Sequence, residues 1–410
     1  DVDNGDHYSR AYMVIDGKTY NGVTGWFEVK VSSVPEVTTE LSEAAGGVLT
    51  LKGSYKLDRD LSVEPGFRYA ATADGVASVQ FVRATQVDEA NKTFSLDIPD
   101  TGQPCFFQAV VRMSTDFYDG EVSEVIRPKD LSAAGVANCY IVTEGGWYSI
   151  EPKRPDGTAV QGSAADWGWS SGSGLVSGVH FSAGRIVFQT SGNAGNAGIA
   201  LTNDAGEIVW SWHIWVTDYS PSATANESVD DENKRVQKYT YGNKTQYPMM
   251  DRNLGAMAGY TIAPSDKLER SKTNGFHYQW GRKDPFPSTY SSKSPTSIVV
   301  NSGQLTPGML NLYQPDGVSY FIRKNVTSLY TILQAFQNPT VIAASGATWS
   351  NQCTGDLWND SQDNKTVYDP CPAGWRVASK VNYLPFFTNS SYTESNDDVQ
   401  AMNLANSSSL

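Results

Sequence analysis

Hydrophobic and polar residues alternate along much of the chain, and this two-residue period is typical of β-strands. Leu49, Leu51, Tyr55 and Leu57 alternate with polar residues, and residues 94–98 repeat the pattern. The clearest strand covers 207–217, where two tryptophans share one face and His213 and Trp215 lie on the other. A helical period occurs at 327–337, in which Leu329, Ile332, Leu333 and Phe336 form one stripe, and Asn325 or Thr327 is a candidate cap. The pattern predicts a mainly β protein.

An internal repeat gives the first domain boundaries. Residues 8–29 match 106–127 at an offset of 98, and each copy reads as strand, turn, strand. Asp16 and Gly17 are a typical hairpin turn pair. A period near 100 residues fits one β-sandwich per repeat. We therefore interpret residues 1–33 as the C-terminal hairpin of a preceding sandwich, and residues 34–130 as a complete sandwich that resembles fibronectin-III or immunoglobulin modules.

The pattern restarts after residue 130 and predicts a second sandwich over 131–220. Residues 221–238 lack a hydrophobic period and concentrate turn formers and charges, so they form a predicted linker. The remainder, 239–410, is the last predicted domain. Its polar C-terminal run leaves open whether that domain is complete.

Composition narrows the functional classes. The net charge of −13 disfavours binding to nucleic acid or to anionic lipid. No run of 18 apolar residues occurs, so the sequence predicts no transmembrane helix. The four histidines lack metal-ligand spacing, and no nucleophile elbow, zincin helix or phosphate loop is present. The expectation is a binding or structural protein, not an enzyme.

Three aromatic-rich motifs follow in order in the C-terminal third: 249–256 (MMDRNLGA), 275–286 (GFHYQWGRKDPF) and 368–377 (YDPCPAGWRV). Together they resemble the major paralogous domain family of the Bacteroidetes and Fibrobacter, found on surface lipoproteins and fimbrial subunits. The resemblance implies an α+β domain of C-type lectin-like fold. The expected fold class is therefore mainly β, with tandem β-sandwich modules followed by a C-type lectin-like domain.

The resemblance also implies a disulfide between Cys353 and Cys371, because the segment 349–371 looks like the family's paired cysteine motif. Two separate thiols remain the alternative. Cys105 and Cys139 lie in apolar strand-like runs and are expected to be buried free thiols. The charged residues of the motifs, such as Arg252 and Arg376, are expected to hold irregular loops through buried or half-buried hydrogen bonds, and a ligand role is the alternative.

Candidate binding residues are aromatic or acidic. Aromatic rings bind the apolar faces of sugars, which makes Trp167, Trp169, His277 and Trp358 the candidate ligand contacts; core packing is the alternative for the first two. Calcium prefers oxygen ligands, and an oxygen-rich loop contains Asp356, Asp360 and Asp363. Their spacing is not that of an EF-hand, so a solvated acidic loop is the alternative. No other cofactor is expected.

These features favour an extracellular modular adhesin or a fimbrial tip or stalk subunit on a bacterial surface. Its expected ligand is a host or dietary glycan or an extracellular protein. A second reading is a pilus or surface-layer subunit that assembles with neighbouring subunits by strand exchange. A third is a glycan-binding lipoprotein that serves a nutrient-uptake system.

Overall fold

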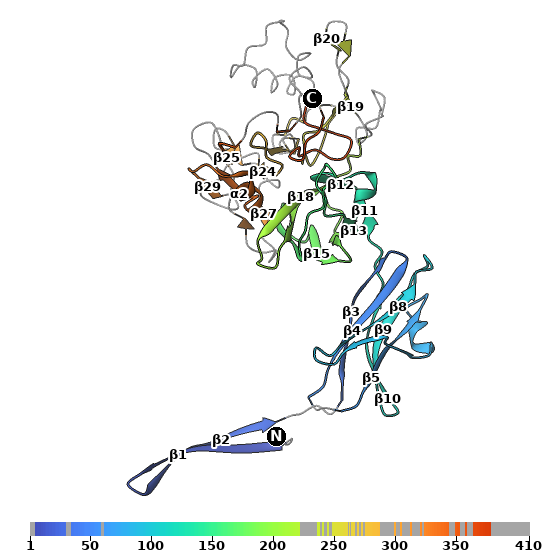
Figure 1. Cartoon of the computed structure of the whole chain (residues 1–410), viewed down its shortest axis with the longest axis vertical. Helices are drawn as coiled ribbons and strands as arrows, with labels where there is room; N and C mark the ends of the chain where they lie inside the picture. Colours follow the sequence, from blue (N-terminus) through green and yellow to red (C-terminus); the bar gives the residue numbers. More distant parts are fainter. Residues whose placement is uncertain are drawn as a thin grey trace. The chain divides into compact units, whose positions relative to one another are not determined.

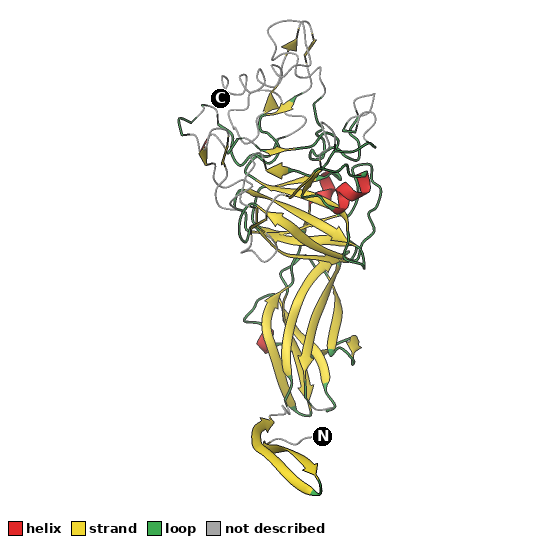
Figure 2. Cartoon of the chain, turned by 90° about the vertical axis from the view of Figure 1, so that its left-hand side faces the viewer, coloured by secondary structure: helices red, strands yellow, loops and turns green. Residues whose placement is uncertain are grey.

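The structure is a computed structural model that describes residues 5–29, 34–58, 61–221 and a series of shorter stretches from 236 to 378. Strands dominate these residues (Figure 2), and the chain divides into two compact units, 1–127 and 128–410. The mainly β prediction is confirmed. The C-type lectin-like fold is not confirmed, and most of the predicted linker lies outside the described residues.

The first unit begins with a two-stranded hairpin, β1 (Gly5–Ile15) and β2 (Lys18–Val29). Asp16 and Gly17 both have positive φ, which is the geometry of the type I′ turn that an Asp-Gly pair favours. The predicted hairpin and its turn are therefore confirmed. Its large side chains are exposed, including Tyr12 at 72 % and Trp26 at 60 %.

The rest of the first unit is a sandwich of two four-stranded antiparallel sheets (Figure 1). One sheet has the order β3 (Glu36–Ala45), β4 (Val48–Lys56), β8 (Thr93–Pro99), β7 (Gln86–Asp88), and the other has the order β10 (Asp116–Glu124), β9 (Phe106–Met113), β5 (Glu64–Ala70), β6 (Val82–Arg83). This is the strand order of an immunoglobulin-like fold with one short additional strand.

The sandwich core follows the alternation in the sequence. Leu49, Leu51 and Tyr55 of β4 point into it, together with Phe94 of the neighbouring strand β8. Phe67 and Phe107 enter it from the facing sheet. A short 3₁₀ turn, η1 (Val76–Ser78), follows β5, and its Val76 is fully buried.

The second unit contains two sheets with a common core. One has the order β11 (Lys129–Asp130), β13 (Gly146–Ile150), β16 (Arg185–Thr190), β15 (Val176–Ser182). The other has the order β12 (Cys139–Val142), β18 (Ile208–Val216), β17 (Gly195–Thr202), β14 (Ala164–Ser170), β27 (Leu312–Tyr313), β28 (Tyr320–Phe321). Trp210 and Trp212 of β18 lie in the core between the sheets.

The described C-terminal stretches form short strands and one helix. The pairs are β19 (Val236–Gln237) with β22 (Met249–Met250), β20 (Thr240–Tyr241) with β21 (Lys244–Thr245), β23 (Phe276–His277) with β24 (Phe286–Pro287), β25 (Val299–Val300) with β26 (Gln304–Leu305), and β29 (Lys324–Val326) with β30 (Val341–Ala343). A four-residue 3₁₀ turn, η2 (Leu131–Ala134), lies near the start of the unit.

The helix α2 (Ile332–Gln337) is shorter than the predicted 327–337. Thr331, not Asn325 or Thr327, caps it, and Gln334 completes a capping box by bonding back to the cap. The apolar stripe extends one turn before this cap, and Leu329 there is exposed. Periodicity alone therefore placed the start of the helix too early.

Residues 128–410 form one compact unit, in which described stretches of the predicted last domain contact the predicted second sandwich. Asn138 of the sandwich donates to the carbonyl oxygens of Val367 and Asp369, each at 2.9 Å. Phe336 of α2 packs on Trp210, with 4.6 Å between ring centroids. The C-terminal stretches thus cover the sandwich instead of standing apart from it.

Candidate functional site

The candidate site lies where the outer face of β17 and β18 meets residues 250–286 and 335–343. Ser211, His213 and Trp215 occupy the face of β18 that does not enter the sandwich core, yet all three are buried. Trp215 donates through Nε1 to the carbonyl oxygen of Ala256 at 2.9 Å. Both faces of this strand are therefore covered by parts of the same unit.

Lys283 and Asp284 form a buried charged pair where these residues meet the outer face of β18. Lys283 Nζ lies 2.7 Å from Asp284 Oδ1 and donates to Ser211 Oγ at 2.6 Å and to the Ser211 carbonyl oxygen at 2.9 Å. Ser211 in turn donates to Asp284 Oδ1 at 2.6 Å. Burial lowers the pKa of Lys283, and the carboxylate of Asp284 opposes that effect. The ammonium also lies 4.6 Å from the ring centroid of Trp210, so a cation–π interaction stabilises its charge.

A cavity of about 140 Å³ borders this pair. Its walls are largely apolar, and the residues that line it include Gly168, Trp169, Trp212, Asp284, Pro285 and Thr340. Asp284 Oδ2 has no hydrogen-bond partner among the described residues. The cavity is smaller than the roughly 300–1,000 Å³ of typical ligand pockets, so it suits only a small group. The aromatic wall beside a carboxylate favours a group that carries both an apolar face and hydrogen-bond donors.

His213 lies beside the cavity wall and is structural. Its Nε2 lies 2.8 Å from Asn196 Oδ1, and Asn196 donates its amide to the Gly255 carbonyl oxygen at 2.9 Å. Because the amide oxygen can only accept, Nε2 carries the proton. Burial lowers the pKa of His213 from 6.5 to about 3, so the ring is neutral. Its ring packs against those of Trp169 and Phe276.

Two arginines fix the loops of the motif region. Arg282 is buried and donates to the carbonyl oxygens of Val341 at 2.7 Å, Asn338 at 3.2 Å and Ala335 at 3.3 Å, at the C-terminal end of α2. The cation therefore lies at the negative end of the helix dipole. Arg252 donates to Asp218 Oδ1 at 2.6 Å and covers the ring of Tyr219. The structural role expected for Arg252 is confirmed.

The predicted ligand residues do not form one exposed surface. Trp167 and Trp169 are both buried, which corrects the idea of an aromatic platform at the surface; Trp169 instead forms part of the cavity wall. His277 is exposed on β23. Trp358 is half-buried and donates to the carbonyl oxygen of Arg282 at 3.0 Å.

The predicted calcium ligands Asp356, Asp360 and Asp363 lie outside the described residues. Among the residues that are described, no cluster of three metal-ligating side chains occurs. Cys371 is a buried, free thiol in the structure. Cys353 lies outside the described residues, so the disulfide between the two stays a prediction. Cys105 and Cys139 are buried free thiols, as expected.

The sequence analysis missed Lys283 and Asp284. Adjacent opposite charges directly after an aromatic strand were a usable signal, because charged residues inside an apolar motif are buried only when they are paired. Ser211 gave no signal of its own. Its role depends on what covers the outer face of β18.

The described residues define a mainly β protein of two compact units, the first of which contains an immunoglobulin-like sandwich. No helix among them is long and apolar enough to cross a membrane. No protein-family model and no curated protein matches the chain.

Solved structures that resemble parts of the chain include FdeC, an adhesin of Escherichia coli (13 % identity, 45 % of this chain and 65 % of that chain, TM-score 0.18). Another is the N-terminal Ig1-2 module of the Drosophila receptor protein tyrosine phosphatase DLAR (12 % identity, 44 % of this chain and 97 % of that chain, TM-score 0.17). The match with FdeC thus spans less than two thirds of the adhesin chain. At these TM-scores the strand order of the sheets, not the likeness, defines the fold.

Proposed function

We propose that this protein is an extracellular, surface-displayed modular adhesin or fimbrial subunit whose second unit binds a small saccharide. The cavity beside Trp169 and Asp284 carries the proposal. A ring of one sugar unit presents an apolar C–H face for tryptophan and hydroxyl donors for a carboxylate. An immunoglobulin-like sandwich ahead of such a unit suits a module that carries a binding site.

Binding fits this site better than catalysis. Ser211 Oγ accepts a hydrogen bond from Lys283 and donates one to Asp284, so the hydroxyl is already engaged as acceptor and as donor. All three side chains are buried, and the ammonium of Lys283 lies over the ring of Trp210. The bonds of Lys283 and Asp284 with Ser211 tie the C-terminal stretches to the sandwich. The arrangement supports a packing role for the Ser–Lys–Asp node, with the cavity as the place for a ligand.

The test is a screen of the whole chain on a glycan array and on extracellular-matrix proteins, followed by titration of each hit. Gly168→Val should weaken saccharide binding at least about tenfold, a 1.4 kcal/mol difference, because the side chain enters the cavity. A Cβ at Gly168 meets only the Gly198 carbonyl oxygen, at 3.9 Å, so the fold should tolerate the change.

Gly172→Val is the matched control. Gly172 follows the same strand but does not line the cavity, and a Cβ there meets only Leu175 at 3.8 Å. Equal loss of binding in both variants, or hits that neither variant affects, would refute a binding role for the cavity. Binding to matrix proteins without any saccharide hit would refute the saccharide assignment.

A second function, assembly with neighbouring subunits, is favoured by the β1–β2 hairpin. A two-stranded sheet is marginal in water, and exposed aromatic side chains mark interaction surfaces. Tyr8 and Trp26 face each other across the hairpin, and both are largely exposed. If assembly is the function, the chain should self-associate in sedimentation velocity runs, and Trp26→Lys should return it to a monomer.

A further inference from the structure

The first sandwich contains a groove that the proposed saccharide cavity does not use. It lies where the chain crosses from β6, at the edge of one sheet, to β7, at the edge of the other. The groove measures about 460 Å³ and is lined by Ser62, Val63, Glu64, Pro65, Arg83, Ala84, Val87, Arg112 and Ser114. That volume is in the range of sites for small ligands.

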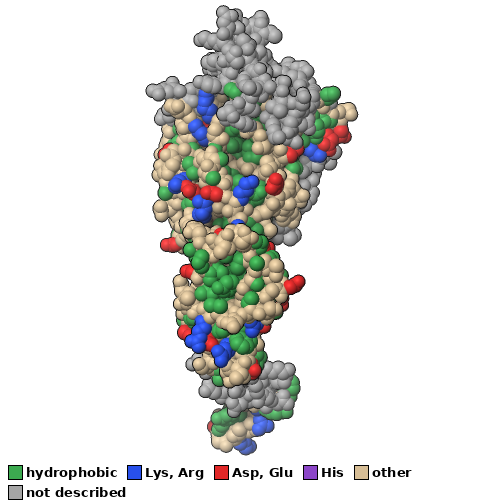
Figure 3. All heavy atoms as spheres, turned by 90° about the vertical axis from the view of Figure 1, so that its right-hand side faces the viewer, with side chains coloured by type: hydrophobic (Ala, Val, Ile, Leu, Met, Phe, Trp, Pro, Cys, Tyr) green, Lys and Arg blue, Asp and Glu red, His purple; other side chains and the backbone are tan. Residues whose placement is uncertain are grey.

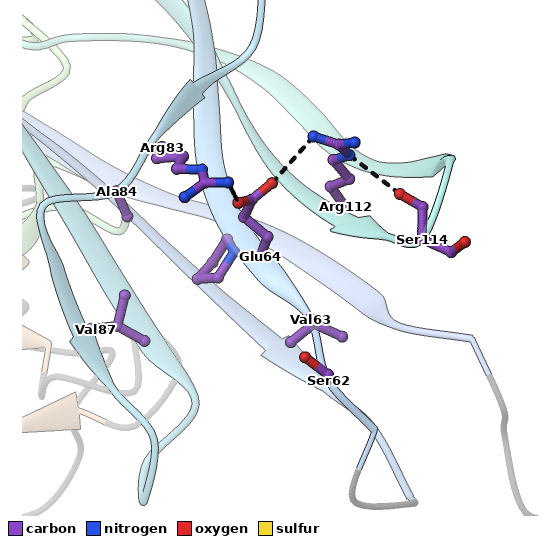
Figure 4. A pocket seen from close by; sticks show the side chains of 9 residues that line it. Ser62, Val63, Glu64, Arg83, Ala84, Val87, Arg112 and Ser114 are labelled. Carbon is purple, nitrogen blue, oxygen red and sulfur yellow. Dashed lines mark hydrogen bonds and ion pairs between the residues drawn. The ribbon is translucent and has the colours of Figure 1, made fainter.

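Three charged side chains dominate the groove (Figure 4). Glu64 lies between Arg83 and Arg112 and forms an ion pair with each, the one with Arg112 at 3.3 Å. Two guanidinium groups against one carboxylate leave a local charge of +1. The chain as a whole carries −13, so this groove is positive against the general background.

Arg112 is held in place from two sides. Its Nε donates to the Ser114 carbonyl oxygen at 3.1 Å, and its guanidinium lies 5.9 Å from the ring centroid of Phe117. Arg68 covers the same ring at 5.0 Å and is neutralised by Asp119 at 2.8 Å. Such stacking orients the planar fork of Arg112 and lowers the entropy lost when it binds an anion.

Arg83 is the accessible partner. Its side chain is 73 % exposed, and its ion pair with Glu64 is made through one terminal nitrogen. Most of this side chain is therefore open to solvent. On the face drawn in Figure 3, basic and acidic side chains are intermixed, without a broad field of one sign. Recognition would therefore depend on the local fork of two arginines and not on long-range attraction.

We propose that this groove binds the anionic group of an acidic saccharide, a carboxylate or a sulfate. The arginine side chains offer paired N–H donors to the oxygens of a planar carboxylate or a tetrahedral sulfate. Ser62, Val63, Val87 and Ser114 line the same groove, and this mixture of polar and small apolar residues suits the rest of a sugar ring. Glu64 keeps the arginines in position and competes with the ligand for them.

The experiment is calorimetric titration of the whole chain with four probes. These are a galacturonate tetrasaccharide, a sulfated heparin-derived tetrasaccharide, neutral maltotetraose and a tetraglutamate peptide. We expect binding of at least one acidic saccharide, which identifies the anion, and none of maltotetraose. Binding of tetraglutamate with equal affinity would overturn the saccharide assignment, and absence of binding by both acidic saccharides would overturn the site.

Two variants with opposite expected effects on affinity distinguish a loss of ligand contacts from a loss of folded structure. Arg83→Gln should weaken binding, and Glu64→Gln should strengthen it, each by about two- to fivefold, the range that exposed ion pairs provide. Arg127→Gln is the control, because Arg127 pairs with Asp100 at 3.0 Å outside the groove. If Glu64→Gln weakens binding as much as Arg83→Gln while both variants keep the circular dichroism of the parent, the proposal is wrong. Gly168→Val should leave this titration unchanged, so the proposal for the cavity and the proposal for this groove are tested independently.

Discussion

Lowering the pH from 7.5 to 5 should destabilise residues 128–410 through the buried imidazole of His213. The pKa of His213 is about 3 in the folded protein, against 6.5 for an unperturbed histidine. Folded protein therefore keeps the ring neutral while unfolded protein takes up a proton below pH 6.5. The stability that neutral His213 contributes is complete above pH 6.5 and is lost as the pH falls toward 3.

The magnitude follows from linkage. Each pH unit below 6.5 costs about 1.4 kcal/mol until the folded pKa is reached, so the free energy of unfolding should fall by roughly 2 kcal/mol at pH 5 from this group alone. Since the ring is buried beside Trp169 and Phe276, solvent screening does not reduce this figure much.

The assay is urea unfolding of the parent and of His213→Gln at several pH values. Tryptophan fluorescence reports the second unit, because Trp26 alone of the tryptophans lies in residues 1–127. Glutamine can still donate to Asn196 Oδ1 but cannot gain a proton. The variant should be less stable at pH 7.5, and the gap should shrink by roughly 2 kcal/mol at pH 5. A gap that changes by less than about 0.5 kcal/mol would refute the reasoning.

Three further results are expected. Arg282→Met should lower the free energy of unfolding by more than about 3 kcal/mol in the same urea assay, because several buried carbonyl oxygens lose their donor. Arg376→Met, at a half-buried side chain, is the control. An equal effect of both variants would contradict the prediction. Gly17→Ala should destabilise the hairpin by about 1 kcal/mol, since alanine disfavours the φ of +74° there; amide hydrogen exchange of β1 and β2 should rise, and unchanged exchange would argue against the turn. Burial raises the pKa of the Cys371 thiol, so it should resist maleimide in native protein and react in urea without reductant; a thiol that stays blocked in urea would instead support the predicted disulfide.

Much of the first sandwich could be predicted from alternation alone. Leu49, Leu51 and Tyr55 enter its core because a strand with one solvated face shows a clean two-residue period. Asp16 and Gly17 marked a hairpin turn because few other residue pairs accept positive φ at both positions. These are local rules, and the sequence displays them directly.

The second unit resisted the same reasoning because its key surfaces are covered by distant segments. Alternation assigned Trp210 and Trp215 to opposite faces of β18, but it could not show that residues 250–286 bury the second face. Trp169 looked like a surface platform in a Gly- and Ser-rich stretch, whereas Phe276 packs on it from over 100 residues away. Burial at such positions depends on long-range contacts that a local pattern does not encode.

The hairpins β1–β2 and β9–β10 of the first unit share a detail that bears on assembly. In β1–β2 the register shifts so that Ala11 faces both Gly22 and Val23, and in β9–β10 Ala109 faces both Gly120 and Glu121. These bulges coincide at the offset of 98, so the two hairpins have the same construction.

What differs is the surroundings of the bulge. A Cβ on Gly120 would meet the backbone nitrogen of Thr39 at 2.9 Å, because β3 crosses close to the bulge. The edge of β9 that faces away from β10 is paired with β5. A Cβ on Gly22 would meet only Ala11 of its own hairpin, at 3.2 Å or more. Among the described residues, β1–β2 therefore has the closing geometry of a sandwich without the strands that its counterpart packs against. Exposed Met13 and Tyr20, which correspond to the inward-facing Val111 and Tyr118, lie on the face that those strands would cover.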